Sequence, residues 1–471
     1  MTRLSRPRAT RTATRSATRT VARSATRTVA RSATRTVAAA LAATGLLGVA
    51  ACGGGTAEQV TADGAVTVQF WYGVSGAAGD YLKQKVAEFN DAHRGRITVE
   101  ASYQGGYEDT FAKLAASIQT GDVPTLMQAS DVQSAYMRDS GIVEPVQDLL
   151  GADGRSVADG LLPIVRNYYE TAGTLWSMPM FVSQPVMYLN NAVLREAGVD
   201  PAGLRTFDDV LGAAQTIHRV TGRAGLTFPV DSWWAEQFAA ASDRLWCTPG
   251  NGVGDTRATA LNADDPALLD LWDRLAAMYA DGSLANLGTS GDKLVGALSA
   301  GTVGILFNSS GGLSAVEKAK IDVTVAPMPR VSDRTGSAPG GNSLWVLKEG
   351  KDDARLRAAA EFVRFVGSAA FQGDVLKTTG YLPSTAEAAQ AARASADANR
   401  RVLLDNEART PATPVTAGCH LGALNEVRAD VRTAMARIAA GESPREQFAE
   451  VQDKAETAVR RYETRVEATQ K

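Results

Sequence analysis

Hydrophobic and polar residues recur with two different periods along most of the chain. A period of two predicts strands at residues 66–71 and 97–103. A period near 3.6 predicts a helix after each strand, at residues 80–92 and 108–120. A further strand is predicted at residues 124–128. Strands that alternate with helices are typical of α/β proteins, so we expect a largely parallel sheet covered by helices.

The alternation continues through the middle of the chain and gives way to helices near its end. Asp265 is suited to cap a helix that begins with Pro266 and ends at Gly282. No long linker interrupts the body, and 471 residues are more than one small core needs, so we expect lobes that interleave in sequence. The other predicted elements are strands at residues 301–307, 323–326 and 343–347 and helices at residues 424–440 and 442–467.

The first 51 residues follow neither pattern. They contain ten Arg and no Asp, Glu or Lys, and an Arg-rich repeat runs from about Arg15 to Ala38. The apolar stretch at residues 37–51 is short and rich in Ala and Gly for a membrane span. A basic segment before a short apolar one is typical of an export signal, so we assign residues 1–51 to a signal peptide. The length of the basic segment leaves the true start codon open.

The signal ends in Val49, Ala50, Ala51 and Cys52. Small residues before a lone Cys resemble a bacterial lipobox, in which the Cys becomes the lipidated first residue. We therefore expect Cys52 to anchor the protein to the membrane, with residues 52–64 as a flexible tether. The alternative is a plain secretory signal in which Cys52 has no role.

The near-neutral net charge hides an acidic body. The whole chain has 49 basic and 51 acidic residues. Without the ten Arg of the signal, 39 basic residues face 51 acidic ones, which gives a net charge of −12. A body this acidic argues against nucleic acid as a partner.

Two cysteines remain once Cys52 is assigned to the anchor. Cys247 and Cys419 form an even pair in an oxidising compartment, where a disulfide is favoured. The sequence does not show whether their Cα atoms come within bridging distance, so the bridge stays open.

Motifs that carry catalysis or bind metals are absent from the sequence. His93, His218 and His420 have no metal-ligand spacing, and there is no Cys-x-x-Cys pair. There is also no Gly-x-Ser-x-Gly elbow, Walker loop or dinucleotide fingerprint. We therefore expect no metal, no cofactor and no enzymatic activity, although carboxylates from distant positions would leave no local signature.

Short motifs spread over residues 65–465 resemble the family 1 extracellular solute-binding proteins of ABC importers, in the order that this family has them. As an ensemble they are most similar to the glycerol-3-phosphate and glycerophosphodiester-binding subgroup. The motifs are Phe70-Trp71, Gly106-Tyr107-Glu108, Thr120-Gly121-Asp122-Val123-Pro124, Gln128-Ala129-Ser130-Asp131, Met178-Pro179, Tyr188-Leu189-Asn190, Gly340-Gly341-Asn342 before Trp345, and Gly380-Tyr381-Leu382-Pro383.

The resemblance implies a two-lobed α/β fold of the periplasmic-binding-protein type II, with the ligand in a cleft between the lobes. Residues 65–180 and 327–383 would form lobe 1, and residues 181–326 and 384–471 would form lobe 2. A ligand that contacts both lobes favours their closure.

The ligand residues implied by the resemblance come from both lobes. Arg428 would hold a phosphate with its planar charged fork, and Asp131 would accept hydrogen bonds from glycerol hydroxyls. The serine hydroxyls and the Gly341 N–H would serve the remaining phosphate oxygens. The full set is Tyr107, Asp131, Gly341 and Tyr381 from lobe 1 and Ser183, Ser309 and Arg428 from lobe 2.

Two features point from a monoester toward a diester. Asp131 stands where the subgroup usually has a longer Glu, which leaves room in the cleft. Trp233 and Trp234 lie in the segment where the subgroup carries cleft aromatics, and an aromatic face suits the quaternary ammonium of choline.

Each of these residues also has a purely structural reading. Arg428 would then lie on a solvated helix face, and Asp131 would cap a helix. Ser309 and Gly341 would belong to turns, and Tyr381 and both Trp would pack in the core.

We therefore predict a monomeric binding lipoprotein that captures glycerophosphocholine or sn-glycerol-3-phosphate outside the cell and delivers it to the permease of an ABC importer. The alternatives are a neutral oligosaccharide-binding protein of the same fold and a cleft phosphodiesterase. Arg428 distinguishes the phosphate-binding hypothesis from the oligosaccharide-binding one, because a neutral sugar needs no cation. Turnover of a diester would distinguish the phosphodiesterase from both binding proteins.

Overall fold

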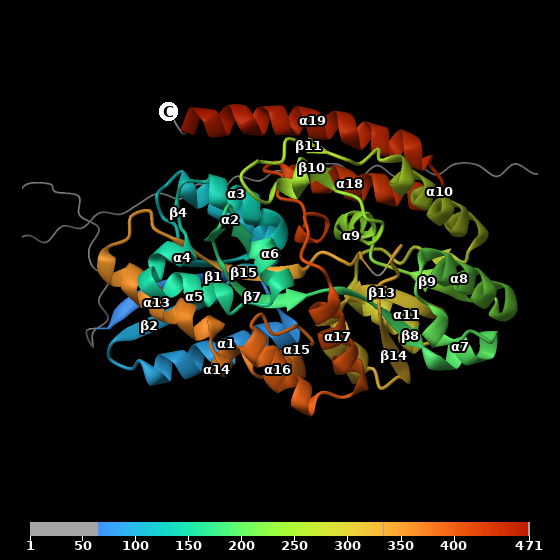
Figure 1. Cartoon of the computed structure of the whole chain (residues 1–471), viewed down its shortest axis with the longest axis horizontal. Coiled ribbons are helices and arrows are strands. Elements are labelled where there is room, and N and C mark those ends of the chain that lie inside the picture. The colour runs from blue at the N-terminus through green and yellow to red at the C-terminus, as the bar shows by residue number, and fades with distance from the viewer. Residues whose placement is uncertain (1–64, 333, 470–471) are drawn as a thin grey trace, which may run out of the picture. The chain divides into compact units, whose positions relative to one another are not determined.

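The computed structural model describes residues 65–332 and 334–469 (Figure 1). The predicted signal peptide, the lipobox Cys52 and the tether lie outside the described residues. Within the described part of the chain, no helix combines the length and the apolar character that a membrane crossing needs.

The first of two main sheets contains the predicted N-terminal strands. Its order is β2-β1-β3-β15-β4, and β7 also pairs with β15. The alternation in the sequence located these strands well, since the predicted strand at residues 97–103 coincides with β2. The strands are β1 (Val66–Tyr72), β2 (Ile97–Tyr103), β3 (Leu126–Ser130), β4 (Val143–Glu144), β7 (Met178–Ser183) and β15 (Gly340–Leu347).

The second sheet has the order β12-β9-β13-β8-β14. Its central strand β13 is apolar and buried over its first five residues, as expected for a strand covered on both faces. The strands are β8 (Pro185–Asn190), β9 (Ala224–Thr227), β12 (Leu284–Ala285), β13 (Val303–Ser309) and β14 (Val323–Pro327).

The prediction of largely parallel sheets is wrong, because both sheets are mixed. In the first sheet β1 pairs in parallel with β2 and β3, but β15 runs antiparallel to β3, β4 and β7. In the second, β8 runs antiparallel to β13 and β14. The prediction assumed that a helix connects each strand to the next, which makes neighbouring strands parallel. Instead β8 follows β7 with only Gln184 between them, and it enters the second sheet directly.

Gln184 is therefore the point where the chain passes from one sheet to the other. Its backbone is tied to Ser310, whose N–H donates to the Gln184 carbonyl at 2.8 Å. Its buried side chain donates from Nε2 to the carbonyl of Leu403 at 2.7 Å and accepts from the amide of Asn406. These bonds hold the crossing segment against α17.

The helices follow the predicted positions, with ends that differ by a few residues. The Asp265 carboxylate accepts from the N–H groups of Ala267 and Leu268, as predicted for a cap, and α10 ends at Gly282 with φ 84°. The longer helices are α1 (Gly76–Ala92), α2 (Tyr107–Ile118), α7 (Asn191–Ala197), α8 (Phe207–Thr221), α9 (Trp233–Ala241), α10 (Pro266–Asp281), α11 (Gly291–Ser299), α13 (Asp353–Gly367), α16 (Ala386–Ser395), α17 (Ala398–Arg409), α18 (Leu424–Ala439) and α19 (Pro444–Thr469).

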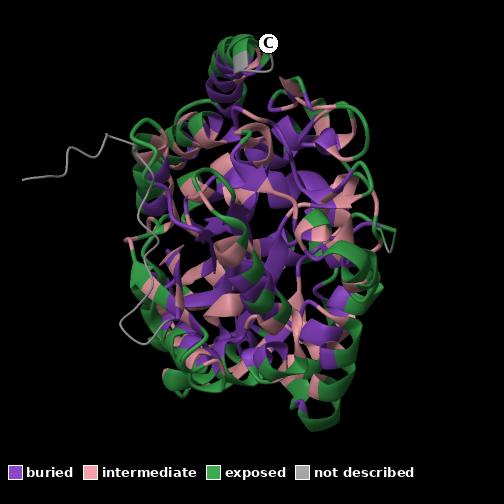
Figure 2. Ribbon diagram, turned by 90° about the vertical axis from the view of Figure 1, so that its left-hand side faces the viewer, coloured by how far each residue is buried: buried purple, intermediate pink, exposed green. Residues whose placement is uncertain are grey.

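Two large apolar clusters stabilise the fold, and the second sheet contributes to both of them, since Leu306 and Phe307 of β13 lie in different clusters. Phe70 of β1 and Phe362 of α13 belong to one cluster, while Phe307 of β13, Trp272 of α10 and Val431 of α18 belong to another. In Figure 2 buried residues fill the interior, and exposed residues follow the outer helices. The face of α10 that carries Trp272 is buried in the same cluster as Phe307.

A disulfide joins Cys247 and Cys419, with their Cα atoms 5.6 Å apart. Cys247 begins β10 (Cys247–Thr248), a short strand paired with β11 (Ala260–Leu261). Cys419 lies five residues before α18. The question that the sequence left open is thereby answered by the fold.

Candidate functional site

A cavity of about 490 Å³ lies where the ends of strands from both sheets meet. Ser183 ends β7, Ser309 ends β13, and Asp131 directly follows β3. Ligand sites commonly form at such strand ends, where the backbone leaves the sheet and side chains are free to face a solute. The lining residues are Tyr107, Glu108, Phe111, Ser130, Asp131, Val132, Gln133, Ser183, Asp231, Trp233, Ser309, Gly341, Tyr381, Asn425, Arg428 and Arg432.

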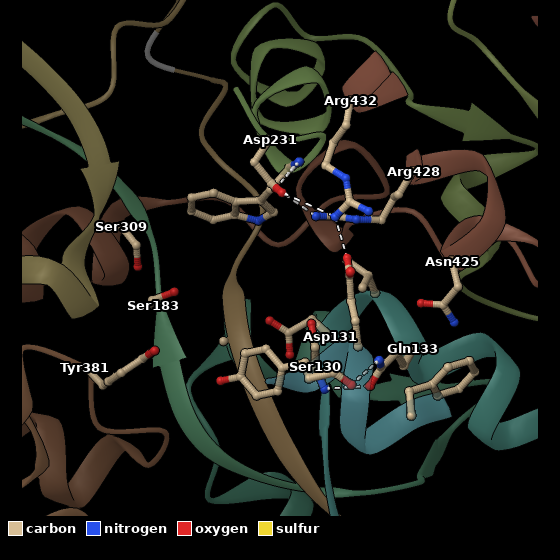
Figure 3. A pocket seen from close by; sticks show the side chains of 16 residues that line it. Ser130, Asp131, Gln133, Ser183, Asp231, Ser309, Tyr381, Asn425, Arg428 and Arg432 are labelled. Atoms are coloured by element: carbon tan, nitrogen blue, oxygen red, sulfur yellow. Dashed lines mark hydrogen bonds and ion pairs between the residues drawn. The ribbon is translucent and has the colours of Figure 1, made fainter. Parts of the chain in front are cut away.

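Eight of the nine predicted ligand residues line this one cavity. They come from positions far apart in the sequence, which makes their convergence a property of the fold. The eight are Tyr107, Asp131, Ser183, Trp233, Ser309, Gly341, Tyr381 and Arg428. In Figure 3 the Ser183, Ser309 and Tyr381 hydroxyls gather on one side, and Asp231, Arg428 and Arg432 lie on another.

Trp234 is the ninth, and its predicted place in the cleft is wrong. Its side chain is only 1% exposed and packs against Phe228, Phe238 and Phe307 in the core. Adjacent residues on a helix point about 100° apart, so α9 directs Trp233 to the cavity and Trp234 inward.

Asp131 is a buried carboxylate with an unsatisfied oxygen. Tyr169 donates its hydroxyl proton to Oδ1, while Oδ2 is buried without a hydrogen-bond partner among the residues that the structure describes. Burial raises the pKa of Asp131 to about 7, against the lowering effect of the Tyr169 hydrogen bond. A buried acceptor without a partner is costly unless a ligand supplies a donor. Asp131 is thus suited to receive a ligand hydroxyl.

Arg428 is held by a carboxylate that the sequence analysis missed. Its Nη2 donates to Oδ1 of Asp231 at 3.0 Å, and only 14% of the Arg428 side chain is exposed. The same Asp231 oxygen accepts from the backbone N–H of Trp233 at 2.9 Å. The structure thereby excludes a freely solvated Arg428.

Arg432 extends this charged group along α18. Its Nη1 pairs with Glu108 of α2 and lies 3.9 Å from Oδ2 of Asp231. A sequence signal existed for Arg432, because residues four apart on a helix share a face. No local signal existed for Asp231, which is 197 residues from Arg428.

The wall that carries Tyr107 is fixed by a buried amide network. Asn342 donates from Nδ2 to the Tyr107 hydroxyl and accepts from Gln128, both at 2.8 Å. Gln128 in turn accepts from the N–H groups of Gly73 and Val74. A network whose members satisfy one another is rigid, so this side of the cavity is preorganised.

Gly341 allows two strands to approach closely at the cavity wall. Its φ is 120°, and a Cβ atom there would lie 1.9 Å from the Phe181 carbonyl oxygen. No other residue fits this position without moving β7.

No metal centre accompanies the site. In the described ranges, His, Cys, Asp and Glu nowhere form a group of three or more that could hold a metal ion. The polar groups that face the cavity are hydroxyls, carboxylates and guanidiniums, which suit a polar, charged organic solute.

Two features define a two-lobed solute-binding protein. The chain passes directly from one helix-covered sheet to the other, and a polar cavity lies at the strand ends of both sheets. The chain belongs to the bacterial extracellular solute-binding proteins, whose family model matches residues 84–402. The predicted family and the type II fold are thereby confirmed. The chain is an extracytoplasmic solute-binding protein, and its family consists of transport proteins rather than enzymes.

Curated relatives align over most of the chain. The sn-glycerol-3-phosphate-binding periplasmic protein UgpB of Agrobacterium fabrum is 29% identical over 379 residues, which cover 77% of this chain and 85% of the relative. UgpB of Escherichia coli K12 is 27% identical over 428 residues, which cover 87% and 95%.

Solved structures show the same fold at lower identity. UgpB from Mycobacterium tuberculosis in complex with glycerophosphocholine aligns with a TM-score of 0.67 and 19% identity, over 84% of this chain and 99% of that one. The GacH receptor of Streptomyces glaucescens, solved unliganded and with acarbose, aligns with a TM-score of 0.69 and the same identity and coverage.

Proposed function

We propose that this chain is the substrate-binding lipoprotein of an ABC importer and that it captures glycerophosphodiesters such as glycerophosphocholine, or sn-glycerol-3-phosphate. The observation that carries the proposal is one cavity that contains the Arg428 guanidinium, the Ser183 and Ser309 hydroxyls and the Asp131 carboxylate. The UgpB relatives, named for binding sn-glycerol-3-phosphate, support the same chemistry.

The two ends of such a ligand match different parts of the cavity. A phosphate needs several donors, which guanidinium and hydroxyl groups supply. A glycerol hydroxyl needs an acceptor, and the unpartnered Oδ2 of Asp131 provides one. Tyr107 and Tyr381 offer flat walls and hydroxyls for the glycerol carbons and oxygens.

Trp233 supports the diester within this class. Trp233 lines the same cavity as Asp231, and its indole would contact a choline group through cation–π attraction of roughly 0.5–2 kcal/mol. A bare monoester has no group that would use this face.

The anchor and the partners are part of the proposal. Lipidated Cys52 would keep the protein, as a monomer, at the outer face of the membrane. There it would present the loaded cavity to the permease subunits.

Arg428→Ala tests the phosphate site. Removing one partner of a partly buried charge pair should weaken binding of any phosphate ligand by about 2–5 kcal/mol, with little change in the melting temperature without ligand. Isothermal titration calorimetry measures the affinity. Arg437→Ala is a matched control, because Arg437 lies on the same helix and pairs with Glu450 outside the cavity.

A thermal-shift panel identifies the ligand class, because a bound ligand stabilises the folded state by mass action. We expect glycerophosphodiesters to raise the melting temperature. Stabilisation by neutral oligosaccharides alone, or unchanged phosphate affinity in Arg428→Ala, would contradict the proposal.

A further inference from the structure

The charged groups of the cavity do not favour a doubly charged anion. Among the described residues that line it, three are acidic, Glu108, Asp131 and Asp231, and two are basic, Arg428 and Arg432. The cavity is therefore not a simple cationic pocket. Any phosphate that binds beside Arg428 also approaches carboxylates.

Asp231 has the decisive position among these acids. Its Oδ1 is 3.0 Å from Nη2 of Arg428, and its Oδ2 is 3.9 Å from Nη1 of Arg432. It is also held in place, because Oδ1 accepts a hydrogen bond from the backbone N–H of Trp233 at 2.9 Å. One fixed carboxylate thus lies between the two guanidiniums that a phosphate would use.

We propose that Asp231 is a specificity-determining residue that selects phosphodiesters with a cationic headgroup over phosphate monoesters. This inference rests on the proposed function and names the residue behind the choice of ligand. A monoanionic diester shares one charge over two oxygens and accepts from the guanidinium N–H groups that Asp231 leaves available. A dianionic monoester places a second negative charge close to the carboxylate, where partial burial keeps the repulsion strong.

The same carboxylate favours a cation. Asp231 and Trp233 are two residues apart, and the Asp231 carboxylate lies at the start of the Trp233 helix. A quaternary ammonium near this indole would face a negative charge together with an aromatic ring. Asp231 would thus weaken the binding of a dianionic phosphate. Asp231 and Trp233 together would strengthen the binding of a cationic headgroup.

Asp231→Asn isolates the charge. The amide oxygen still accepts from Trp233 and Arg428, so the geometry is retained while the negative charge is lost. Calorimetric titration at about pH 8 would compare glycerol-3-phosphate, a dianion, with glycerophosphoglycerol, a monoanionic diester, and glycerophosphocholine, a zwitterion. Wild-type affinity should rise in that order.

In Asp231→Asn, affinity for glycerol-3-phosphate should increase by about tenfold or more, and affinity for glycerophosphocholine should stay level or fall. Asp231→Glu, which keeps the charge, should retain the wild-type order. Asp292→Asn removes an exposed charge on α11 outside the cavity and should change none of the affinities.

The possible outcomes distinguish a failure of the proposed role of Asp231 from a failure of the proposed function. If the wild type binds none of the three compounds, the proposed function fails and the inference fails with it. The wild type could instead prefer glycerophosphocholine while Asp231→Asn keeps the ratio of the two affinities, for glycerophosphocholine and glycerol-3-phosphate, within about twofold of the wild-type ratio. That result would overturn only the role of Asp231. Tighter wild-type binding of glycerol-3-phosphate than of glycerophosphocholine overturns Asp231 as a discriminator.

Discussion

Asp131 shows how much a single residue depends on its surroundings. The sequence offered two readings, a ligand acceptor and a helix cap. In the structure Asp131 is the first residue of a short 3-10 helix, Asp131–Gln133, and its carboxylate lies in the cavity wall at 5% exposure. The carboxylate therefore serves the cavity, and its protonation is set by burial.

The raised pKa of Asp131 predicts a pH dependence of stability. Its folded pKa of about 7 exceeds the value near 3.9 of an unfolded Asp, so the folded state binds the proton more tightly. The contribution of Asp131 to the free energy of unfolding is therefore fully present below about pH 4, and it is lost as the pH rises to about 7. Relative to Asp131→Asn, the wild-type free energy of unfolding should fall by about 1–4 kcal/mol over this range.

Urea denaturation at several pH values measures this difference. Asp292→Asn, an exposed Asp on α11, should follow the wild-type curve. Parallel curves for wild type and Asp131→Asn would show that Asp131 ionises as it does in the unfolded chain.

Helix α9 shows how one element divides its roles between neighbours. Trp233 lines the cavity, and Trp234 is buried against three Phe rings. Helix geometry alone predicts that the two indoles diverge, but not which of them faces the ligand.

The two Trp variants should therefore fail in different ways. Trp234→Ala should lower the free energy of unfolding by about 3–5 kcal/mol, because it removes a large buried side chain. Trp233→Ala should lose much less stability, but its preference for glycerophosphocholine over glycerol-3-phosphate should shrink to the part that the Asp231 charge supplies, while phosphate recognition remains. Chemical denaturation and calorimetric titration of both variants measure the two effects. A preference in Trp233→Ala that is unchanged from the wild type would remove the indole from choline recognition.

Helix α18 divides its roles by face. Arg428 and Arg432 face the cavity, whereas Val427, Val431 and Met435 are buried in the core around the second sheet. The buried face fixes the helix, and the helix fixes the two guanidiniums.

At the scale of the whole molecule, the disulfide connects the segments that follow α9 and precede α18, the two helices that carry Trp233 and Arg428. Cys419 precedes α18, and its N–H donates to the buried Glu236 of α9 at 2.6 Å. The bridge to Cys247 spans 172 residues of sequence. It therefore restrains a large loop in the unfolded chain and links the segments that carry Arg428 and Trp233.

Loss of this bridge should destabilise the fold. The double variant Cys247→Ala, Cys419→Ala should unfold with a free energy about 2–5 kcal/mol lower than that of the oxidised wild type. Guanidinium denaturation with and without a reductant measures this, and the reductant should not affect the double variant. Equal stability of all forms would mean that the two thiols are not bridged in solution.

The proposed anchor predicts where the protein resides. Cys52→Ala should release it from membranes without changing ligand binding, because no other segment of the mature chain is expected to hold it there. Membrane fractionation of cells that express the variant measures this, with Gly53→Ala as a control that keeps the thiol. Unchanged membrane association of Cys52→Ala would contradict the lipobox.

The sequence by itself determined the elements whose signals are local. The alternation at residues 97–103 gave β2, and Asp265, Pro266 and Gly282 bounded α10, because periodicity and capping act within a few residues. The order of motifs along the chain also indicated the family and eight of the residues that share the cavity.

Only the tertiary structure decided which distant groups meet. It placed Asp231 on Arg428 across 197 residues, joined Cys247 to Cys419, turned β8 and β15 antiparallel and sent Trp234 rather than Trp233 into the core. These outcomes depend on how whole sheets and helices pack, and no short window of sequence carries that information. The charge in the cavity is the clearest case, because the carboxylates beside Arg428 decide how strongly its guanidinium would attract the proposed anion.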